Sequence, residues 1–384
     1  MSVWDCVVGQ EQAVKRLRAA ACGDSSALAQ SWLICGAEGF GAVTLARAFA
    51  AALESPDHGE SEGELSQVAR EVLAGSHPDV NTLSTDAVTI SIDDVREIVS
   101  ISEQMPSTAY WRIIIIEDIQ RMLERSTNVL LKEIEEPSPH TIWILCASSV
   151  QDVLPTIRSR TQIVQLTTAD EKSVSKYIAD KTGADKSLSN SVARIAQGNL
   201  QLAELYASDE RALSRRNELV YGLLHMRAAT DAVILAGNLI DDSKAQAETE
   251  VQSGVEAEQD EFRRINGLTK DDRIPSKLRA AYNAIGKKDE VKRKVTRTSR
   301  DVLNRALNAV ESVYRDILMV LNNAQESSPI INQDFYADIN NLAKDFTIKR
   351  ALLCVDEISK ARRRLVGNGN PTLVFEALFC ALLY

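Results

Sequence analysis

The stretch WLICGAEGFGAV at residues 32–43 decides the fold of the first part of this chain. Its first four residues are apolar and predict a buried strand, and residues 44–53 follow with apolar side chains at helical spacing. Gly36 and Gly41, with Gly39 between them, have the spacing of a phosphate-binding loop, G-x-x-x-x-G-K-[ST]. A strand that runs through such a loop into a helix predicts an α/β sheet protein.

The two functional positions that follow the last glycine of this loop are changed. In an active loop a lysine binds the β- and γ-phosphates, and a hydroxyl binds the magnesium ion. Ala42 stands in the lysine position and Val43 in the hydroxyl position, and neither side chain offers a polar group. The loop also has an ordinary structural interpretation, because glycine-rich turns occur wherever a helix packs closely on a sheet. We therefore expect a degenerate nucleotide loop.

Short apolar runs and helical patterns alternate through residues 1–166. The β-branched run Ile113–Ile116 is typical of a strand that is covered on both faces. Strands are predicted over residues 32–35, 79–83, 113–116, 141–146 and 161–166. Helices are predicted over residues 44–53, 93–103, 119–125 and 126–134, and an exposed loop over residues 54–64. This alternation implies a parallel sheet whose strands end beside the Gly36 loop, where open α/β sheets bind ligands.

Two acidic residues, Glu117 and Asp118, follow the predicted strand 113–116. An apolar strand that ends in acidic residues is how nucleotide hydrolases hold magnesium, although their usual order is Asp then Glu. The alternative is that both residues cap a helix over residues 119–125 and stabilise its N-terminus. We favour the capping role and interpret the pair as a degenerate magnesium segment.

An arginine-containing segment, LPTIRSRT at residues 154–161, precedes the last predicted strand. Arg160 is compatible with an ordinary surface charge. It is equally compatible with an arginine finger, whose planar guanidinium stabilises transition-state charge in a neighbouring subunit. The segment alone leaves both interpretations open.

The strand signals end after residue 166. Residues 167–210 predict a small helical lid, and residues 211–384 predict an all-helical domain, with apolar residues at spacings of three and four over residues 303–321. Residues 241–272 are acidic and predict a solvated helix or a mobile insertion, whereas Lys287–Arg300 is strongly basic. The predicted fold class is α/β plus all-α.

The bulk properties of the chain exclude several classes of protein. A formal net charge of −10 over 384 residues argues against a protein that coats nucleic acid through its overall field. The six cysteines contain no C-x-x-C pair, so neither a zinc site nor a disulfide framework is predicted, and Cys35 and Cys146 are expected in the core. Because the sequence lacks an apolar signal region or a run of membrane-spanning length, we expect a cytoplasmic protein.

Four segments resemble the clamp-loader AAA+ family of bacterial DNA polymerase III. They are VGQE at residues 8–11, GSHPDV at residues 75–80, NVLLKEIEEP at residues 128–137 and LPTIRSR at residues 154–160. The last two are long and specific. Together with the changed loop, they are most similar to the delta-prime branch of the family, in its actinobacterial versions. The strong resemblance covers roughly the first half of the chain.

The resemblance implies an AAA+ core (1–166), a lid (167–210) and a collar domain (211–384). It implies a non-catalytic stator in a hetero-pentamer with motor (gamma/tau) subunits and a delta subunit, which loads a sliding clamp onto primed DNA during replication. In that role Arg160 is the arginine finger for ATP held by the neighbouring motor subunit, and Ser159 orients it. The chain itself is then expected to bind neither ATP nor zinc, and to belong to a nucleoid-associated replisome.

Several positions depart from the family pattern. Residues 54–73 contain no cysteine where many relatives carry a zinc module, and Thr161 replaces the cysteine of the S-R-C motif. Gln201 stands where active AAA+ proteins often place a nucleotide-sensing arginine, and Ser148 is the only sensor candidate after the fourth strand. Two other functions stay open: an active AAA+ ATPase, such as a motor subunit or a helicase loader, and a stand-alone DNA-binding protein that uses Lys287–Arg300.

Overall fold

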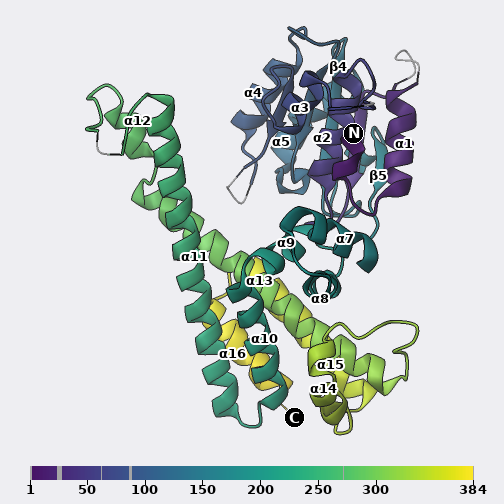
Figure 1. The fold of residues 1–384 in the computed structure, drawn as a ribbon, viewed down its shortest axis with the longest axis vertical. Helices are drawn as coiled ribbons and strands as arrows, with labels where there is room; N and C mark the ends of the chain where they lie inside the picture. The colour runs from purple at the N-terminus through teal and green to yellow at the C-terminus, as the bar shows by residue number, and fades with distance from the viewer. Residues whose placement is uncertain (1, 24–27, 62, 86–88, 271, 384) are drawn as a thin grey trace. The chain divides into compact units, whose positions relative to one another are not determined.

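The computed structural model describes residues 2–23, 28–61, 63–85, 89–270 and 272–383. These residues form two compact units, residues 1–209 and residues 210–384. The first contains a parallel sheet with helices on both faces and a small helical lid, and the second is all-helical (Figure 1). This architecture confirms the predicted fold class. Within the described residues, no helix is both long enough and apolar enough to cross a bilayer.

The sheet of the first unit has five parallel strands in the order β2-β3-β4-β1-β5. The strands are β1 (Ser31–Cys35), β2 (Val80–Leu83), β3 (Arg112–Ile116), β4 (Thr141–Ala147) and β5 (Gln162–Gln165). All five predicted strands are confirmed to within two residues. Every residue of β1, β3 and β4 is buried, because helices cover both faces of these strands.

Helices from opposite sides complete a three-layer core. Side chains alternate along each strand, so Trp32 and Ile34 point to one core cluster while Leu33 and Cys35 point to the other. Helices α1, α2 and α3 contribute to the first cluster, and helices α4, α5 and α6 to the second. Cys146 is buried with the first cluster, as expected. The helices are α1 (Glu11–Ala21), α2 (Ala42–Glu54), α3 (Gln67–Leu73), α4 (Ile92–Ser102), α5 (Glu124–Glu135) and α6 (Pro155–Arg158).

The helix predicted over residues 119–125 is wrong. Only a 3-10 turn, η3 (Ile119–Arg121), forms there, and α5 begins separately at Glu124. Asp118 occupies the position before the turn with φ of 52°, and its side chain makes no capping hydrogen bond. The predicted capping role of the acidic pair is therefore not what the structure shows. Helices α1 and α3 were not predicted from the sequence.

The lid of the first unit consists of three short helices that begin at side-chain caps. They are α7 (Glu171–Thr182), α8 (Lys186–Ala196) and α9 (Leu200–Ser208). The side chains of Asp170, Asp185 and Asn199 accept hydrogen bonds from backbone N–H groups of the first turns. The lid helices follow directly from β5, and each is anchored at its N-terminus by one of these caps.

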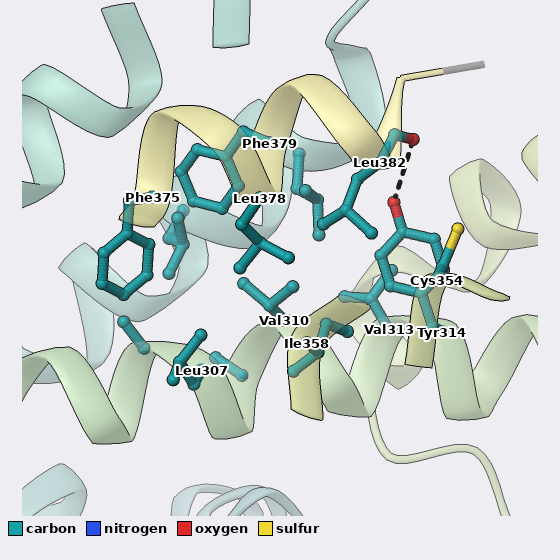
Figure 2. Close-up of a cluster of buried hydrophobic side chains, with 14 of the residues drawn as sticks. Leu307, Val310, Val313, Tyr314, Cys354, Ile358, Phe375, Leu378, Phe379 and Leu382 are labelled. Atoms are coloured by element: carbon teal, nitrogen blue, oxygen red, sulfur yellow. Dashed lines mark hydrogen bonds between the residues drawn. The ribbon is translucent and has the colours of Figure 1, made fainter. Parts of the chain in front are cut away.

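The second unit is built around one apolar core (Figure 2). The predicted apolar stripe lies on α13, where Leu307, Val310 and Tyr314 are fully buried in a cluster that also includes side chains of α15 and α16. The hydroxyl of Tyr314 donates to the carbonyl of Leu382 at 3.4 Å, drawn as a dashed line in Figure 2. The helices are α10 (Glu210–His225), α11 (Ala229–Ile265), α12 (Arg279–Ala284), α13 (Lys288–Leu321), α14 (Tyr336–Ala343), α15 (Ile348–Val366) and α16 (Pro371–Leu382).

The acidic stretch 241–272 is helical for most of its length. It forms the second half of α11, a single helix of 37 residues that carries buried side chains as far as Val255. Residue 271 lies outside the described residues, as does residue 62 of the predicted loop 54–64. Of the two alternatives from the sequence, the structure therefore supports the helix.

Candidate functional site

The glycine-rich loop has the backbone of a strand-to-helix nucleotide turn. It leaves β1 at Cys35 and enters α2 at Ala42. Gly39 and Gly41 have φ of 80° and 87°, in the left-handed region that glycine adopts without strain. A side chain at Gly36 would collide with Leu166, whose Cδ1 lies 2.7 Å from the position of a Cβ. The three glycines of the predicted loop are therefore required by the fold itself.

The lid closes over this loop from the other side. The side-chain amide of Asn199 donates to the carbonyl of Glu38 at 3.0 Å, and the backbone N–H of Leu200 donates to the carbonyl of Gly39 at 2.9 Å. A Cβ at Gly39 would lie only 2.1 Å from the Asn199 side-chain oxygen. The start of α9 thus makes direct contacts with the loop. Gln201, the candidate at the sensor position, is exposed one residue further on.

The first helical positions after the loop are apolar. Ala42 and Val43 are partly buried and pack against the core cluster that includes Leu45 and Phe49. Neither provides a charge for a phosphate or an oxygen for magnesium. Together with the Asn199 contacts, this donor set does not fit a bound magnesium nucleotide, and no catalytic step can be derived through one.

The acidic pair after β3 is already matched by cations of the chain. Arg47 on α2 lies 3.6 Å from the Glu117 carboxylate, and Arg121 lies 3.1 Å from the Asp118 carboxylate. Burial raises the pKa of the Glu117 carboxyl and outweighs the opposing effect of Arg47. Ser148, the other sensor candidate, donates to Asp152 at 3.0 Å. The charges at this end of the sheet are therefore balanced within the chain.

Arg160 lies between α6 and β5 and is held by three neighbours. Its guanidinium forms an ion pair with Glu135 at the end of α5 and donates to the carbonyl of Thr156 at 2.9 Å. It also donates to the hydroxyl of Ser159 at 3.4 Å. The side chain keeps 34% of its surface exposed. Ser159 therefore contacts Arg160, and Glu135 is a partner that the sequence did not reveal.

A surface hollow of about 290 Å³ lies beside this arginine. Its lining includes the polar side chains of Gln30, Ser31 and Gln162 as well as Glu135 and Arg160. Arg160 is one of the lining residues, and about a third of its side-chain surface is accessible. A group from another molecule could therefore reach it without any unfolding of the chain.

The loop and Arg160 lie at opposite ends of two neighbouring strands. The loop follows the carboxyl end of β1, whereas Arg160 precedes the amino end of β5, and the two strands are parallel neighbours. A strand of four to five residues separates its ends by roughly 13–16 Å. The structure therefore does not bring these two predicted groups together in one site. The acidic pair at Glu117 lies on the loop side, because it follows β3.

Two of the motif segments have structural roles. The side chain of Gln10 donates to the carbonyl of Thr167 at 2.7 Å and accepts from the Thr167 N–H at 3.0 Å. A Cβ on Gly9 would lie 2.6 Å from Ala169. This pair therefore fixes the start of the chain to the segment that connects β5 with the lid.

Asp79 of the GSHPDV segment is fully buried beneath the turn before β3. It accepts hydrogen bonds from the backbone and hydroxyl groups of Ser107 and Thr108 and forms an ion pair with Arg112 at 3.1 Å. Burial acts to raise the pKa of Asp79, but these hydrogen bonds prevail and hold it well below its usual range. The residue is thus a buried anchor.

The strand order, the loop after β1, the acidic end of β3 and the helical lid are those of a parallel α/β module of the nucleotide-loop type. Residues 9–170 match the family model described as DNA polymerase III, delta subunit. Through these residues the chain is similar to subunits of the DNA polymerase III clamp loader.

Relatives of two kinds match this chain. DNA polymerase III subunit delta' of Haemophilus influenzae is 32% identical over 113 residues, which are 29% of this chain and 35% of that protein. DNA polymerase III subunit gamma/tau of Mycobacterium tuberculosis is 31% identical over 163 residues, or 40% of this chain and 27% of that protein. A solved gamma subunit-related protein of Thermotoga maritima is 16% identical with a TM-score of 0.42, covering 97% of this chain and 98% of its own.

The chain spans only about a third of the length of these two curated relatives. Because relatives named delta' and relatives named gamma/tau both match, the similarity points to clamp-loader subunits in general, and the kind of subunit has to be argued from the site.

Proposed function

We propose that this chain is a delta-prime stator subunit of a DNA polymerase III clamp loader and supplies Arg160 to ATP held by a neighbouring motor subunit. The observation that carries the proposal is the position of Arg160. It is partly exposed beside a surface hollow. It precedes the amino end of β5, whereas the chain's own loop follows the carboxyl end of the neighbouring strand β1. An arginine so placed is available to a second molecule and not to its own loop.

The ion pair with Glu135 fits a group that is held ready for transfer. Both partners are substantially exposed, with 34% of the Arg160 and 49% of the Glu135 side-chain surface accessible. Exposed ion pairs contribute only about 0.2–1 kcal/mol. A bidentate contact with a phosphate is a charge-assisted interaction of about 1.5–3 kcal/mol. Arg160 can therefore exchange Glu135 for a phosphate at small cost.

The chain's own loop supports a non-catalytic subunit. Ala42 and Val43 replace the lysine and the hydroxyl, Asn199 contacts the loop, and Arg47 already pairs with Glu117. Loss of the lysine alone removes a contact of about 1.5–3 kcal/mol. We propose that this chain binds neither ATP nor zinc and is not itself an ATPase.

The proposed partners follow from the same role. They are motor subunits of the gamma/tau kind and a delta subunit in a hetero-pentamer, with the helical unit 210–384 as the collar. Sliding clamp and primed DNA are contacted through the assembled complex, in the cytoplasm at the replisome. An active AAA+ ATPase, as in a motor subunit or a helicase loader, is the alternative; magnesium-dependent ATP turnover by the purified chain alone would establish it.

The test is the DNA-stimulated ATPase rate of the pentamer reconstituted with Arg160→Ala. Removal of an arginine finger lowers turnover at the site it serves by about 10³-fold or more. With three motor sites of equal and independent rate, silencing one removes about a third of total turnover, and coupled sites lose more. The Arg160→Ala variant should form the pentamer as the wild type does, as measured by gel filtration.

Two further variants make the result specific. Arg96→Ala removes an arginine on α4 whose side chain is 63% exposed and pairs with nearby Asp93, and it should leave the rate unchanged. Glu135→Gln releases Arg160 from its resting partner and should preserve the stimulated rate. A pentamer with Arg160→Ala that turns over ATP as fast as the Arg96→Ala pentamer would remove Arg160 from the proposed role.

A further inference from the structure

Residues 241–300, which we call the arm, form a helical hairpin in the second unit. The arm comprises the second half of α11, the short helix α12 and the first part of α13. In Figure 1 α12 lies at the far end of α11, away from α10, α15 and α16, which surround the core of this unit. The arm therefore extends beyond the apolar core of the helical domain.

Contacts between the two long helices fix the register of the arm. The hydroxyls of Ser243 and Ser299 lie 3.1 Å apart, and Ser243 is fully buried. Val251 and Val255 are buried further along α11, and Gly286 leaves no room for a side chain against Val255. The arm is thus a packed hairpin that holds its surface charges in fixed positions.

The charge on the arm is divided between its two sides. Residues 241–261 on α11 contain eight acidic residues and one lysine, whereas residues 262–300 contain thirteen lysines and arginines against four acidic residues. The whole chain carries a net charge of −10, so the sign of the charge on the positive side is opposite to that of the chain as a whole. A local field of this sign attracts anions even when the overall charge is negative.

Several cations on the positive side have no acidic partner. Near the tip, Lys270 pairs with Asp260 and Arg264 pairs with Glu261. By contrast, five exposed cations at the start of α13 form no ion pair with any residue in the described ranges. They are Lys287, Lys288, Lys292, Arg293 and Lys294.

The geometry points to the phosphate backbone of duplex DNA as the partner of these cations. We propose that the start of α13 binds duplex DNA through phosphate contacts that do not depend on sequence. The two aromatic residues of the arm, Phe262 and Tyr282, pack on each other with ring centroids 5.8 Å apart. We therefore do not propose that the arm recognises bases by stacking. Arg263 covers the ring of Tyr282 at 5.1 Å.

The acidic side of the arm restricts the side from which DNA can approach. Antiparallel packed helices lie about 8–10 Å apart, so the carboxylates of α11 repel a duplex that approaches from their side. DNA is then accepted only along α13. This contact lies in the all-helical unit and does not involve Arg160 or the glycine-rich loop, so it is independent of the role proposed for Arg160.

The experiment measures binding of a short random-sequence DNA duplex to the full chain by fluorescence anisotropy over a range of salt concentrations. The arm variant replaces four cations by glutamine, a good helix former: Lys288→Gln, Lys292→Gln, Arg293→Gln and Lys294→Gln. The control removes the same number of charges from exposed lysines of the first unit: Lys15→Gln, Lys172→Gln, Lys176→Gln and Lys186→Gln.

Four phosphate contacts predict a slope of log K against log salt of about −3.6, equivalent to roughly 10²-fold weaker binding when salt rises from about 50 to about 200 mM. The arm variant should lose this slope and most of its affinity at low salt, while the control keeps both. Equal binding by the arm variant and the wild type would overturn the proposal, as would an equal loss in the control. Binding of poly-glutamate without binding of the duplex would assign the arm to an acidic protein instead.

Discussion

Replacement of Asp79 tests whether the GSHPDV segment stabilises the fold. Asp79→Ala removes a fully buried carboxylate that lies 3.1 Å from the guanidinium of Arg112, which is itself only 8% exposed. It also leaves the backbone N–H groups of Ser107, Thr108 and Ala109 without their acceptor. Arg112 keeps only the carbonyls of its own neighbourhood as partners.

The expected loss of stability is large. Breaking a buried ion pair by removal of one partner costs about 3–5 kcal/mol, because the other charge stays buried without compensation. Asp79→Asn keeps the shape of the side chain but places an NH₂ group against backbone N–H donors, which cannot rotate away from it. Its cost should lie between that of the alanine variant and zero, at about 2 kcal/mol. Acidification should have a related effect, since a depressed pKa means that this stabilisation is present above about pH 4 and is lost below it.

Urea unfolding followed by tryptophan fluorescence measures this effect in the relevant unit. All four tryptophans, Trp4, Trp32, Trp111 and Trp143, lie within residues 1–209, so the signal reports the unit that contains Asp79. With an m-value of about 2 kcal/mol/M, the alanine variant should shift the midpoint by roughly 1.5–2.5 M.

The matched control is Asp93→Ala, which removes a carboxylate with 85% exposure and should shift the midpoint very little. A shift of Asp79→Ala no larger than that of the control would refute the assignment of Asp79 as a buried anchor. Its place in the motif would then require a functional explanation.

The remaining predictions concern groups near the two ends of α2. Burial raises the pKa of Glu54 to about 8, so stability is fully present below about pH 4 and declines as pH rises towards 8. Glu54→Gln should therefore stabilise the first unit near pH 8, by up to about 5 kcal/mol, and not near pH 4; an equal gain at both would contradict this. Ala42→Lys with Val43→Thr should still bind ATP no tighter than about 1 mM in calorimetry, because Asn199 keeps its contact with the loop; tighter binding would show that the lid contact is irrelevant.

The sheet could be predicted from the sequence because its signals are local. Runs such as Ile113–Ile116 identify strands wherever both faces are covered, and the glycines of residues 36–41 mark the turn by their spacing. The segment 119–125 misled the prediction. Its helical pattern is interrupted by Asp118 in the left-handed region and by a three-residue turn, and neither can be read from residue types alone.

The contacts that give the site its character could not be predicted in the same way. Asn199 reaches the Glu38 carbonyl across 161 positions of the sequence, and Arg47 reaches Glu117 across the layers of the core. Glu135 belongs to a motif that marks a helix, and only the fold shows that it holds Arg160. These pairings depend on which strands become neighbours, so they follow from topology and not from spacing.

The structure explains how a chain can keep the glycines of this loop when Ala42 and Val43 follow them. The glycines are fixed by neighbours inside the unit, since Gly36 faces Leu166 and Gly39 faces Asn199. Ala42 needs no charge for any of these contacts. The requirements of the fold and those of phosphate binding therefore fall on different residues of one loop. Arg160 lies at the opposite end of the neighbouring strand β5. Its proposed contribution to a neighbouring subunit therefore depends on the intact fold and not on the residues of the loop.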